Sequence, residues 1–576
     1  MASLLIKNGA VFDPLNKING DKMDIAIRDG VIVDLQDLPK DAPVINAAGM
    51  VVFPGGVDIH THVVGPKVNM GRLLRPEDHR KDTVHKTDHT RSGTGFSVPT
   101  TYVTGYRYAK MGYTTVCEPA MPPLLARHIH EEFADLPILD KLAMPMFGNN
   151  WFVLEYIKSG QPEMLKAYIA WLLNATKGYA VKIVNPGGVE NWGWGKNCDS
   201  LDSMVEHFGV TPRQILTSLG TANEELGLPH TIHVHGNNLG HPGNAAFTKD
   251  TLEVMKGVKP RAGRDATVHF THIQFNSYSG TNWDNFGSGA PEVAEYVNAN
   301  KHVTCDVGQI VFANTTTMTG DGPWEFALYH LGGTADWGNK PGVKWVNDQV
   351  EAECGSGVVP YDFRPKNPVN AVQWAIGLEF FLLVNDPLRI HLTTDHPNAG
   401  PFFYYPKIIR WLMSANDRVA WLKDKVHSKT GTKSHLPDLT REYSLFEIAA
   451  ITRAAAARNL GLGDTKGHLG IGAQGDVAIY GLDPAEKDPD KIEKAFSNTA
   501  YTIKDGAVVV KNGEVVLSPV GRTLWTDATA SIKPDIWAKL EADIKEKWPM
   551  RYTINLANYP VQSSFIPHPM AILPKV

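Results

Sequence analysis

Apolar and polar positions near the two ends of the chain follow the same short alternating pattern. In residues 4–53, runs rich in valine and isoleucine are separated by glycine-containing tripeptides at residues 7–9, 28–30 and 47–49. The pattern returns in the apolar run at residues 476–480 and in turn signals at 504–506 and 511–515. Asn-Gly and Asp-Gly between such runs are strong signals for β-hairpins. We therefore predict one small β domain built from both chain ends; two unrelated hairpins are the alternative.

The middle of the chain alternates short β-rich runs with longer helical stretches. The predicted strands are residues 114–117, 180–184, 231–234, 268–271, 302–307 and 389–393, and the predicted helices include 161–176, 211–226 and 290–300. This alternation is typical of parallel strands joined by crossover helices. In so long a segment it favours an α/β fold with a (β/α)8 TIM-like barrel, and a doubly wound open sheet is the alternative.

These patterns divide the chain into three parts. We predict a composite β domain of residues 1–53 plus 466–520, a barrel of residues 54–465 and a C-terminal extension of residues 521–576. Residues 187–209 and 315–370 are too long and polar for simple connections, so we expect loops over an active site or contacts with a partner. The apolar stretch 371–384 contains Glu379 and is too short to cross a bilayer, so it predicts a buried helix and no membrane span.

Composition narrows the class of protein. The 576 residues include 56 Lys and Arg against 61 Asp and Glu, a formal net charge of -5, with no block of like charges. This balance argues against nucleic acid or an anionic membrane as the main partner. The four cysteines lie far apart without a C-x-x-C pair, and the start of the chain lacks the pattern of a signal peptide. We therefore expect a cytoplasmic protein that carries no redox cofactor on this chain.

Side chains that bind metals follow several of the predicted strands. His60 and His62 come after the apolar run at residues 50–53 and a Pro-Gly-Gly turn. Residues i and i+2 of an extended segment point the same way, so both imidazoles can reach one ion. In a barrel, the end of a strand where such residues lie is the catalytic face. An accidental pair of surface histidines is the alternative.

Three further strands end in candidate ligands. His233 and His235 close one predicted strand, and His269 and His272 close the next. The second histidine of each pair is the preferred ligand because it lies where a loop begins, and the first is equally consistent with a core histidine. Asp395 follows the last strand at the same level, with a turn or N-cap aspartate as the alternative.

Lys182 lies in the middle of the apolar strand 180–184. It either extends its ammonium to a rim or a carboxylate, or it is buried as a neutral amine that reacts with carbon dioxide to give a carbamate. A carbamate is an anion that bridges two cations. The full candidate ligand set is His60, His62, Lys182, His235, His272 and Asp395. It suits zinc, with iron, cobalt, nickel or manganese as alternatives, and six ligands favour two ions with a shared bridge.

This ligand set and the glycine-rich residues 466–476 resemble the amidohydrolase superfamily, of the cyclic-amidase and dihydroorotase type. Longer stretches resemble the amidohydrolase-type subunits of formylmethanofuran dehydrogenases, at residues 65–69, 75–81, 104–108, 118–123, 147–151, 185–189 and 393–401. The resemblance extends along nearly the whole chain. It departs around residues 331–345, where this chain carries extra residues.

The resemblance implies a site with two Zn²⁺ ions and an N6-carboxylated Lys182, in one subunit of a multi-subunit complex. In such a complex, a separate subunit with a tungsten or molybdenum pterin, like that of formate dehydrogenase, reduces carbon dioxide to formate. The amidohydrolase subunit then condenses formate with methanofuran to N-formylmethanofuran, as the first step of methanogenesis, or runs the reverse reaction. Three alternatives are the hydrolytic subunit of the formyltransferase/hydrolase complex of methylotrophic bacteria, another cyclic-amide or N-acyl hydrolase, and a scaffold without activity.

The residues also predict roles in catalysis. Asp395 is the expected proton carrier, which takes a proton as hydroxide attacks the formyl carbon and returns it to the departing amine. Trp192 and Trp194 are candidates for a lid that excludes water. Candidate substrate contacts are Arg75, His79, Arg107, Asn237, His396 and Asn398. Salt bridges with other protein groups explain Arg75, His79 and Arg107 equally well.

Overall fold

The computed structural model describes residues 3–332, 345–350 and 354–575. In this part of the chain, parallel strands form two arcs, β6–β7–β8 and β9–β10–β11–β14–β18. Bridges between Met146 and Lys182 and between Thr61 and His396 join the arcs into a closed ring. The ring strands are β6 (Gly56–Asp58), β7 (Tyr113–Met121), β8 (Asp140–Pro145), β9 (Lys182–Val184), β10 (Ile232–His235), β11 (Val268–Phe270), β14 (Val303–Asp306) and β18 (Ile390–His391). The predicted (β/α)8 barrel is therefore confirmed over the open-sheet alternative.

All six predicted strands of the middle segment are strands of this ring, and two ring strands were missed. β6 is only three residues long and was interpreted as a turn, and β8 begins with the charged pair Asp140-Lys141. The apolar run before His60 is not the strand that carries it. That run forms β5 (Val51–Pro54) of a different sheet, and β6 leads to His60.

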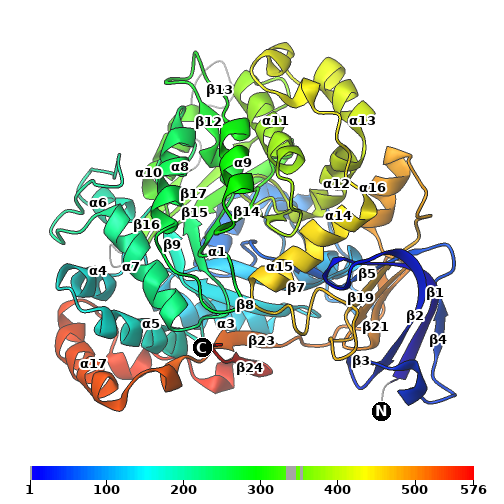
Figure 1. Cartoon of the computed structure of the whole chain (residues 1–576), viewed down its shortest axis with the longest axis horizontal. Coiled ribbons are helices and arrows are strands. Elements are labelled where there is room, and N and C mark those ends of the chain that lie inside the picture. Colours follow the sequence, from blue (N-terminus) through cyan, green and yellow to red (C-terminus); the bar gives the residue numbers. More distant parts are fainter. Residues whose placement is uncertain (1–2, 333–344, 351–353, 576) are drawn as a thin grey trace.

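Helices cover the outside of the ring (Figure 1). The predicted helices correspond to α5 (Pro162–Thr176), α7 (Pro212–Glu225) and α9 (Ala290–Ala299), and the apolar stretch forms the buried α11 (Pro368–Leu383). A capping box between Thr211 and Gln214 fixes the start of α7. Further helices are α2 (Thr101–Lys110), α3 (Ala126–Ala134), α4 (Trp151–Lys158), α8 (Asn244–Met255), α12 (Tyr405–Met413), α14 (Leu445–Ala449), α15 (Ala455–Asn459) and α16 (Pro489–Ser497). Among the described residues, no helix combines the length and apolar character that crossing a membrane requires.

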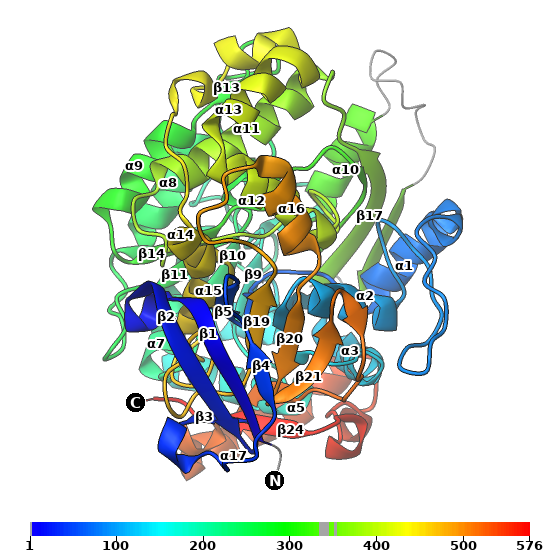
Figure 2. The ribbon, with the colours of Figure 1, turned by 90° about the vertical axis from the view of Figure 1, so that its right-hand side faces the viewer.

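A second sheet combines strands from both ends of the chain. Its order is β22-β21-β20-β19-β5-β1-β2-β3, with β4 beside β1. β5 pairs with β19 in antiparallel register, with Val477 opposite Pro54, and Figure 2 shows the two groups of strands side by side. The strands are β1 (Ser3–Asp13), β2 (Ile18–Arg28), β3 (Val31–Val33), β4 (Val44–Asn46), β5, β19 (Val477–Tyr480), β20 (Tyr501–Lys504), β21 (Ala507–Lys511) and β22 (Glu514–Val515). The predicted union of both ends is present, and the domain boundaries proposed above stay a prediction.

One predicted hairpin turn was wrong. Residues 7–9 do not reverse the chain but lie inside the long strand β1, where its register with β2 shifts between Ile6 and Gly9. Asn8 adopts a left-handed φ of 62°, and a Cβ at Gly9 would lie 2.4 Å from a methyl carbon of Val52. The Asn-Gly pair is thus used for a bulge under close packing, which produces the same local signal as a turn.

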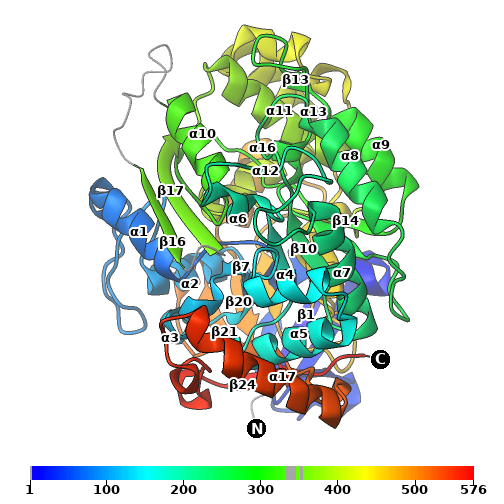
Figure 3. The same ribbon diagram turned by 90° about the vertical axis from the view of Figure 1, so that its left-hand side faces the viewer.

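The segment predicted as loops at residues 315–370 contains regular structure. β15 (Asn314–Thr319) and β16 (Val346–Val350) pair with β17 (Cys354–Asp362) in a small antiparallel sheet, and α10 (Gly322–Gly332) precedes β16. Val68 of α1 (Pro66–Leu74) packs with Met318 and Val358 of this sheet, and Figure 3 shows the two side by side. The strands were missed because polar threonines dominate β15. The extra residues expected at 331–345 lie largely outside the described residues.

The C-terminal part of the chain extends one arc of the barrel. β23 (Thr523–Thr526) lies beside β8 and pairs in parallel with β24 (Pro569–Ile572). α17 (Pro534–Lys547) follows β23 and packs on α5 (Figure 1). Near its end, the rings of Trp548 and Tyr559 contact Trp171 of α5. The extension therefore adds a layer over the barrel helices.

Candidate metal-dependent active site

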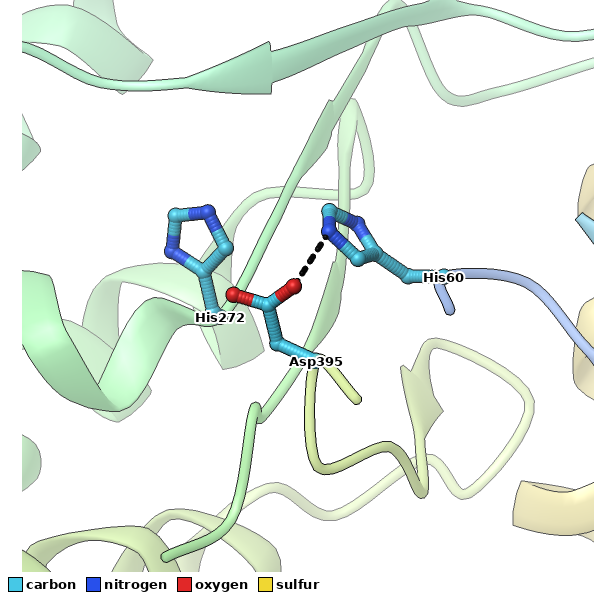
Figure 4. Close-up of side chains that lie close together, drawn as sticks. All are labelled: His60, His272 and Asp395. Atoms are coloured by element: carbon cyan, nitrogen blue, oxygen red, sulfur yellow. Dashed lines mark ion pairs between the residues drawn. The ribbon is translucent and has the colours of Figure 1, made fainter. Parts of the chain in front are cut away.

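Three side chains from different strands meet at one end of the barrel. His60 follows β6, His272 follows β11 and Asp395 follows β18, and one ligand atom of each lies within 4.8 Å of the others. Figure 4 shows the carboxylate of Asp395 between the two imidazole rings. All three side chains are buried. Because the C-terminal ends of all parallel strands meet at one face, residues that follow different strands come together in space.

The contact between His60 and Asp395 is suited to a cation. Nε2 of His60 lies 2.9 Å from Oδ1 of Asp395, but this oxygen has no hydrogen-bond partner of good geometry. Nδ1 of the buried His272 is also without a partner. His272 and Asp395 hold left-handed φ values of 36° and 47°, which are uncommon for residues with a side chain. Orphaned acceptor atoms and local strain of this kind concentrate at ligand-binding sites.

His62 joins the same group and is held from behind by a carboxylate. Its Nε2 lies 3.3 Å from Oδ1 of Asp395, and its Nδ1 lies 2.7 Å from Oε1 of Glu118. Burial lowers the pKa of His62, but the neighbouring Glu118 and Asp395 outweigh burial and raise that pKa above its ordinary value. Pairing of one ring nitrogen with a carboxylate leaves the other aimed at the site, as is typical of metal-binding histidines.

Lys182 of β9 is buried and lies close to this group. Burial lowers the pKa of its amine to about 7, although Asp395 and Asp306 raise it in part. A large fraction of the side chain is therefore a neutral amine at neutral pH. Between the two alternatives left open by the sequence, this environment favours the buried, reactive amine over an ammonium that reaches a rim.

His235 of β10 completes the set. Its ring centre lies 4.7 Å from that of His272, and its Nε2 lies 2.9 Å from Oδ2 of Asp321. Asp321 also accepts a hydrogen bond from Asn185 at 2.9 Å. Because the carboxylate takes the Nε2 proton, Nδ1 of His235 is the nitrogen that can bind a metal.

The first histidine of each pair behaves as a core histidine with satisfied hydrogen bonds. His233 contacts His60 at 2.9 Å and His230 at 3.0 Å. His269 lies 3.0 Å from Oγ1 of Thr304 and 3.1 Å from Oδ2 of Asp306. Both rings lie beneath the candidate ligands, where they contact neighbouring groups of the barrel interior.

Three of the predicted substrate contacts lie near Asp395 or the ligand loops. Asn398 donates to Oδ2 of Asp395 at 2.8 Å. Asn237 donates to Oδ1 of Asn185 at 2.7 Å and keeps its own Oδ1 buried without a partner. The ring of His396 packs edge-on against Phe402. A substrate role for each of these residues stays a prediction, and Asn398 has the most direct link to the proposed catalytic carboxylate.

The other three predicted contacts have protein partners. Arg75 pairs with Asp362 at 2.8 Å, and Nδ1 of His79 lies 3.0 Å from Oγ1 of Thr94. Arg107 pairs with Asp82 at 2.7 Å. These contacts account for the two guanidinium charges without a substrate, as the salt-bridge alternative expected.

The tryptophans expected to form a lid lie in different environments. Trp192 contacts Phe326 of α10, with ring centres 5.5 Å apart. Trp194 is 54% exposed and packs against His207. Trp192 therefore joins two segments beside the site, and Trp194 is largely in solvent.

A narrow pocket opens beside the ligand group and has an aromatic wall. Phe275 contacts Trp324 and Phe363, with a ring-centre distance of 6.4 Å in each pair. The pocket is lined by His235, Leu239, Phe275, Thr317, Thr319, Trp324, Leu328, Phe363, Asp395 and Asn398. This combination suits a flat apolar ring whose polar end reaches the ligand group.

Several residues of the site were missed in the sequence. Glu118 follows the predicted strand 114–117, and Asp306 lies within 302–307, so the rule that identified His235 applies to both carboxylates. Asp321 and Trp324 lie in the segment predicted as loops, and nothing in their local sequence marks them.

A model of the amidohydrolase family matches residues 43–510. The chain belongs to the amidohydrolase family. This amidohydrolase is 54% identical to Protein FwdA of Methanocaldococcus jannaschii over 97% of both chains. It is 39% identical to a second relative over 88% of both chains, the first-lettered (A) component of the formyltransferase/hydrolase complex Fhc of Methylorubrum extorquens.

One solved structure resembles this amidohydrolase over its whole length. It is the X-ray crystal structure of the formyltransferase/hydrolase complex FhcABCD from Methylorubrum extorquens with methylofuran. The matched chain is 34% identical, both chains are covered completely, and the TM-score is 0.87. The resemblance inferred from the ligand residues and the longer motifs is therefore confirmed.

Proposed function

We propose that this protein is the metal-dependent amidohydrolase subunit of a complex that interconverts formate plus methanofuran and N-formylmethanofuran. The convergence of His60, His272 and Asp395 within 4.8 Å is the observation that carries the proposal. The identity of 54% with Protein FwdA and the fold shared with a chain of the methylofuran complex support it.

The residues fit a pair of zinc ions. His60, His62, His235, His272, Asp395 and a carboxylated Lys182 would hold them. Imidazole and oxygen donors suit zinc, and the orphaned atoms of His272 and Asp395 are free to bind a cation. When bound, the ions would polarise the formyl oxygen and lower the pKa of a water molecule.

Asp395 is the proposed proton carrier. Burial raises its pKa, but His60, His62 and His272 outweigh burial and hold that pKa well below its usual range. The side chain is therefore a carboxylate that can take a proton during hydrolysis and return it to the leaving amine. Asn398 donates to Oδ2 at 2.8 Å and keeps the carboxylate in place. Condensation reverses the proton transfers.

The aromatic pocket is the proposed site of the furan ring. Phe275, Trp324 and Phe363 provide apolar faces beside Asp395. A planar ring bound there would place its aminomethyl or formamide group toward the carboxylate. The same walls would exclude water, which the condensation direction requires.

The proposed partners are the other chains of the complex, including a subunit with a tungsten or molybdenum pterin that supplies formate. A hydrolytic role in a formyltransferase/hydrolase complex is the second candidate, favoured by the TM-score of 0.87 with a chain of that complex. The two candidates share the amide chemistry, and purification of the native complex distinguishes them: a pterin subunit supports the first and its replacement by formyltransferase chains supports the second.

The amide chemistry is tested on the purified complex with N-formylmethanofuran, hydantoin and dihydropyrimidine as substrates. We expect cleavage of the formamide only, and loss of at least about a thousandfold in kcat in Asp395→Asn. Asp438→Asn, at an exposed carboxylate, is the matched control. Unchanged activity in Asp395→Asn, or clearly less than one metal ion per active chain, contradicts the proposal.

A further inference from the structure

A row of buried histidines extends from His60 toward the opposite end of the barrel. Nδ1 of His60 lies 2.9 Å from Nε2 of His233, and Nδ1 of His233 lies 3.0 Å from Nε2 of His230. Nδ1 of His230 lies 2.6 Å from the backbone oxygen of Asn459, at the end of α15. The three imidazoles have 0 or 1% exposure, so no bulk water interrupts the row.

The carbonyl at the far end gives this row a direction. A carbonyl oxygen only accepts hydrogen bonds, so Nδ1 of His230 carries a proton and donates it. A neutral imidazole has a single N–H, and Nε2 of His230 is then an acceptor for Nδ1–H of His233. By the same step, Nε2 of His233 accepts from Nδ1–H of His60. Nε2 of His60 is left with a free lone pair, and this is the nitrogen 2.9 Å from Asp395.

The environment keeps these rings neutral. Burial lowers the pKa of His230 and His233 well below the ordinary value and also lowers that of His60. Asp306 is a competing acceptor for His60, but its Oδ2 is 3.6 Å from Nδ1 of His60 and already 3.1 Å from His269. His233 is therefore the nearer acceptor.

We propose that the carbonyl of Asn459, His230 and His233 form a tautomer relay that holds His60 as its Nδ1–H form and presents Nε2 to the metal. His230 and His233 are positioning residues that act through His60. The inference rests on the proposed two-metal site, and it assigns a role to two histidines that contact neither substrate nor metal.

The other histidine ligands are oriented differently. His62 pairs with Glu118 and His235 pairs with Asp321, so carboxylates fix their tautomers. A neutral relay fixes His60 without a further negative charge in the barrel interior. Asp58 already lies there, with its pKa raised by burial to about 7.

The relay is tested by zinc affinity in the purified complex, measured by competition with a chelator. His233→Leu removes the acceptor and the donor, and we expect one of the two ions to bind about 10–100-fold more weakly. His233→Gln keeps one acceptor and one donor in a similar volume and should recover most of the lost affinity. His391→Leu is the matched control, because His391 belongs to the same buried cluster but bonds to Cys305 O and Asn459 Nδ2 instead of a ligand.

A second measurement does not depend on how the variants fold. Nitrogen-15 NMR of the zinc-loaded wild-type complex, with labelled histidine in this chain, should show His230 and His233 as Nδ1–H tautomers, with assignments from single-histidine variants. The opposite tautomer in either residue, or wild-type zinc affinity in folded His233→Leu, overturns the relay. A wild-type protein that binds no metal would instead contradict the proposed function, so the two failures are distinct.

Discussion

Oε1 of Glu118 lies 2.7 Å from Nδ1 of His62, and its other oxygen accepts the backbone N–H of Val63 at 2.9 Å. One carboxylate thus holds both the ring and the backbone that follows it. Glu118 ends the buried portion of a barrel strand, β7, with 1% exposure. The orientation of His62 toward Asp395 therefore depends on a residue that is not itself a candidate ligand.

Replacement of Glu118 by glutamine should weaken metal binding. The amide has one acceptor oxygen, so it cannot serve both His62 and Val63 as the carboxylate does. We expect zinc affinity to fall about 10–100-fold, measured by chelator competition and metal analysis. Glu379→Gln is the control, because Glu379 is a buried carboxyl that accepts backbone N–H groups from His435 and Leu436 without contact to a ligand. Equal losses in both variants would attribute the effect to general destabilisation.

Loading of the metal-free protein with zinc should depend on carbon dioxide and pH through Lys182. Its amine has a pKa of about 7, so the reactive neutral fraction rises with pH up to this value and levels off above about pH 8. An ordinary lysine would still gain about tenfold per pH unit in this range. The measurement is the rate of activity recovery at fixed dissolved carbon dioxide between pH 6 and 9. Recovery without carbon dioxide, or in Lys182→Ala, would contradict a carbamate ligand.

Removal of an aromatic wall should weaken substrate binding more than catalysis. Trp324 lines the pocket beside Asp395, whereas Trp192 packs against Phe326 and does not line it. We expect Trp324→Ala to raise KM for N-formylmethanofuran about tenfold, corresponding to loss of one stacking contact. Trp192→Ala should change KM less than threefold. The reverse order of effects would favour the lid that the sequence suggested at Trp192.

Lys141 of β8 is a buried cation that costs stability at neutral pH. Burial lowers its pKa to about 8, and its amine donates to the carbonyl of Leu136 at 3.1 Å. Below pH 8 the lysine is protonated in both the folded and unfolded states, and the folded state carries a penalty of about 3 kcal/mol. Lys141→Met removes this penalty and loses one hydrogen bond, a net stabilisation of about 2 kcal/mol at pH 7.

The sign of this effect changes with pH in a defined window. Between about pH 8 and 10.5 the unfolded lysine binds more protons than the folded one, so wild-type stability rises with pH. The advantage of Lys141→Met should therefore shrink through this window and vanish by its upper end. Urea unfolding at pH 7 and pH 10 measures it, with Lys545→Met at an exposed position of α17 as control. A constant difference at both pH values would contradict the assignment.

Strand ends were predictable because their signal is local. A run of apolar residues followed by a polar ligand type identified His235, His272 and Asp395 without knowledge of any neighbour. The same rule, applied consistently, extends to Glu118 and Asp306. It failed where the strand itself was too short or too charged, as in β6 and β8.

The composite sheet was predictable for a similar reason, since both chain ends carry the same alternation. Its details were not. The Asn-Gly pair at residues 8 and 9 has the local preference for left-handed φ in both a turn and a bulge, and only the packing of Val52 against Gly9 distinguishes the two. Local conformational preference thus specifies the backbone angle but not the direction in which the chain continues.

By itself, the sequence determined the barrel class and six candidate ligands, because hydrophobic periodicity and residue chemistry are properties of short segments. Only the tertiary structure decided which groups orient those ligands. Asp321 reaches His235 from a distant segment, and His230 reaches His60 through His233. The aromatic pocket likewise combines segments far apart in the chain. Such contacts depend on how a closed barrel brings remote residues together, and no local pattern encodes that distance.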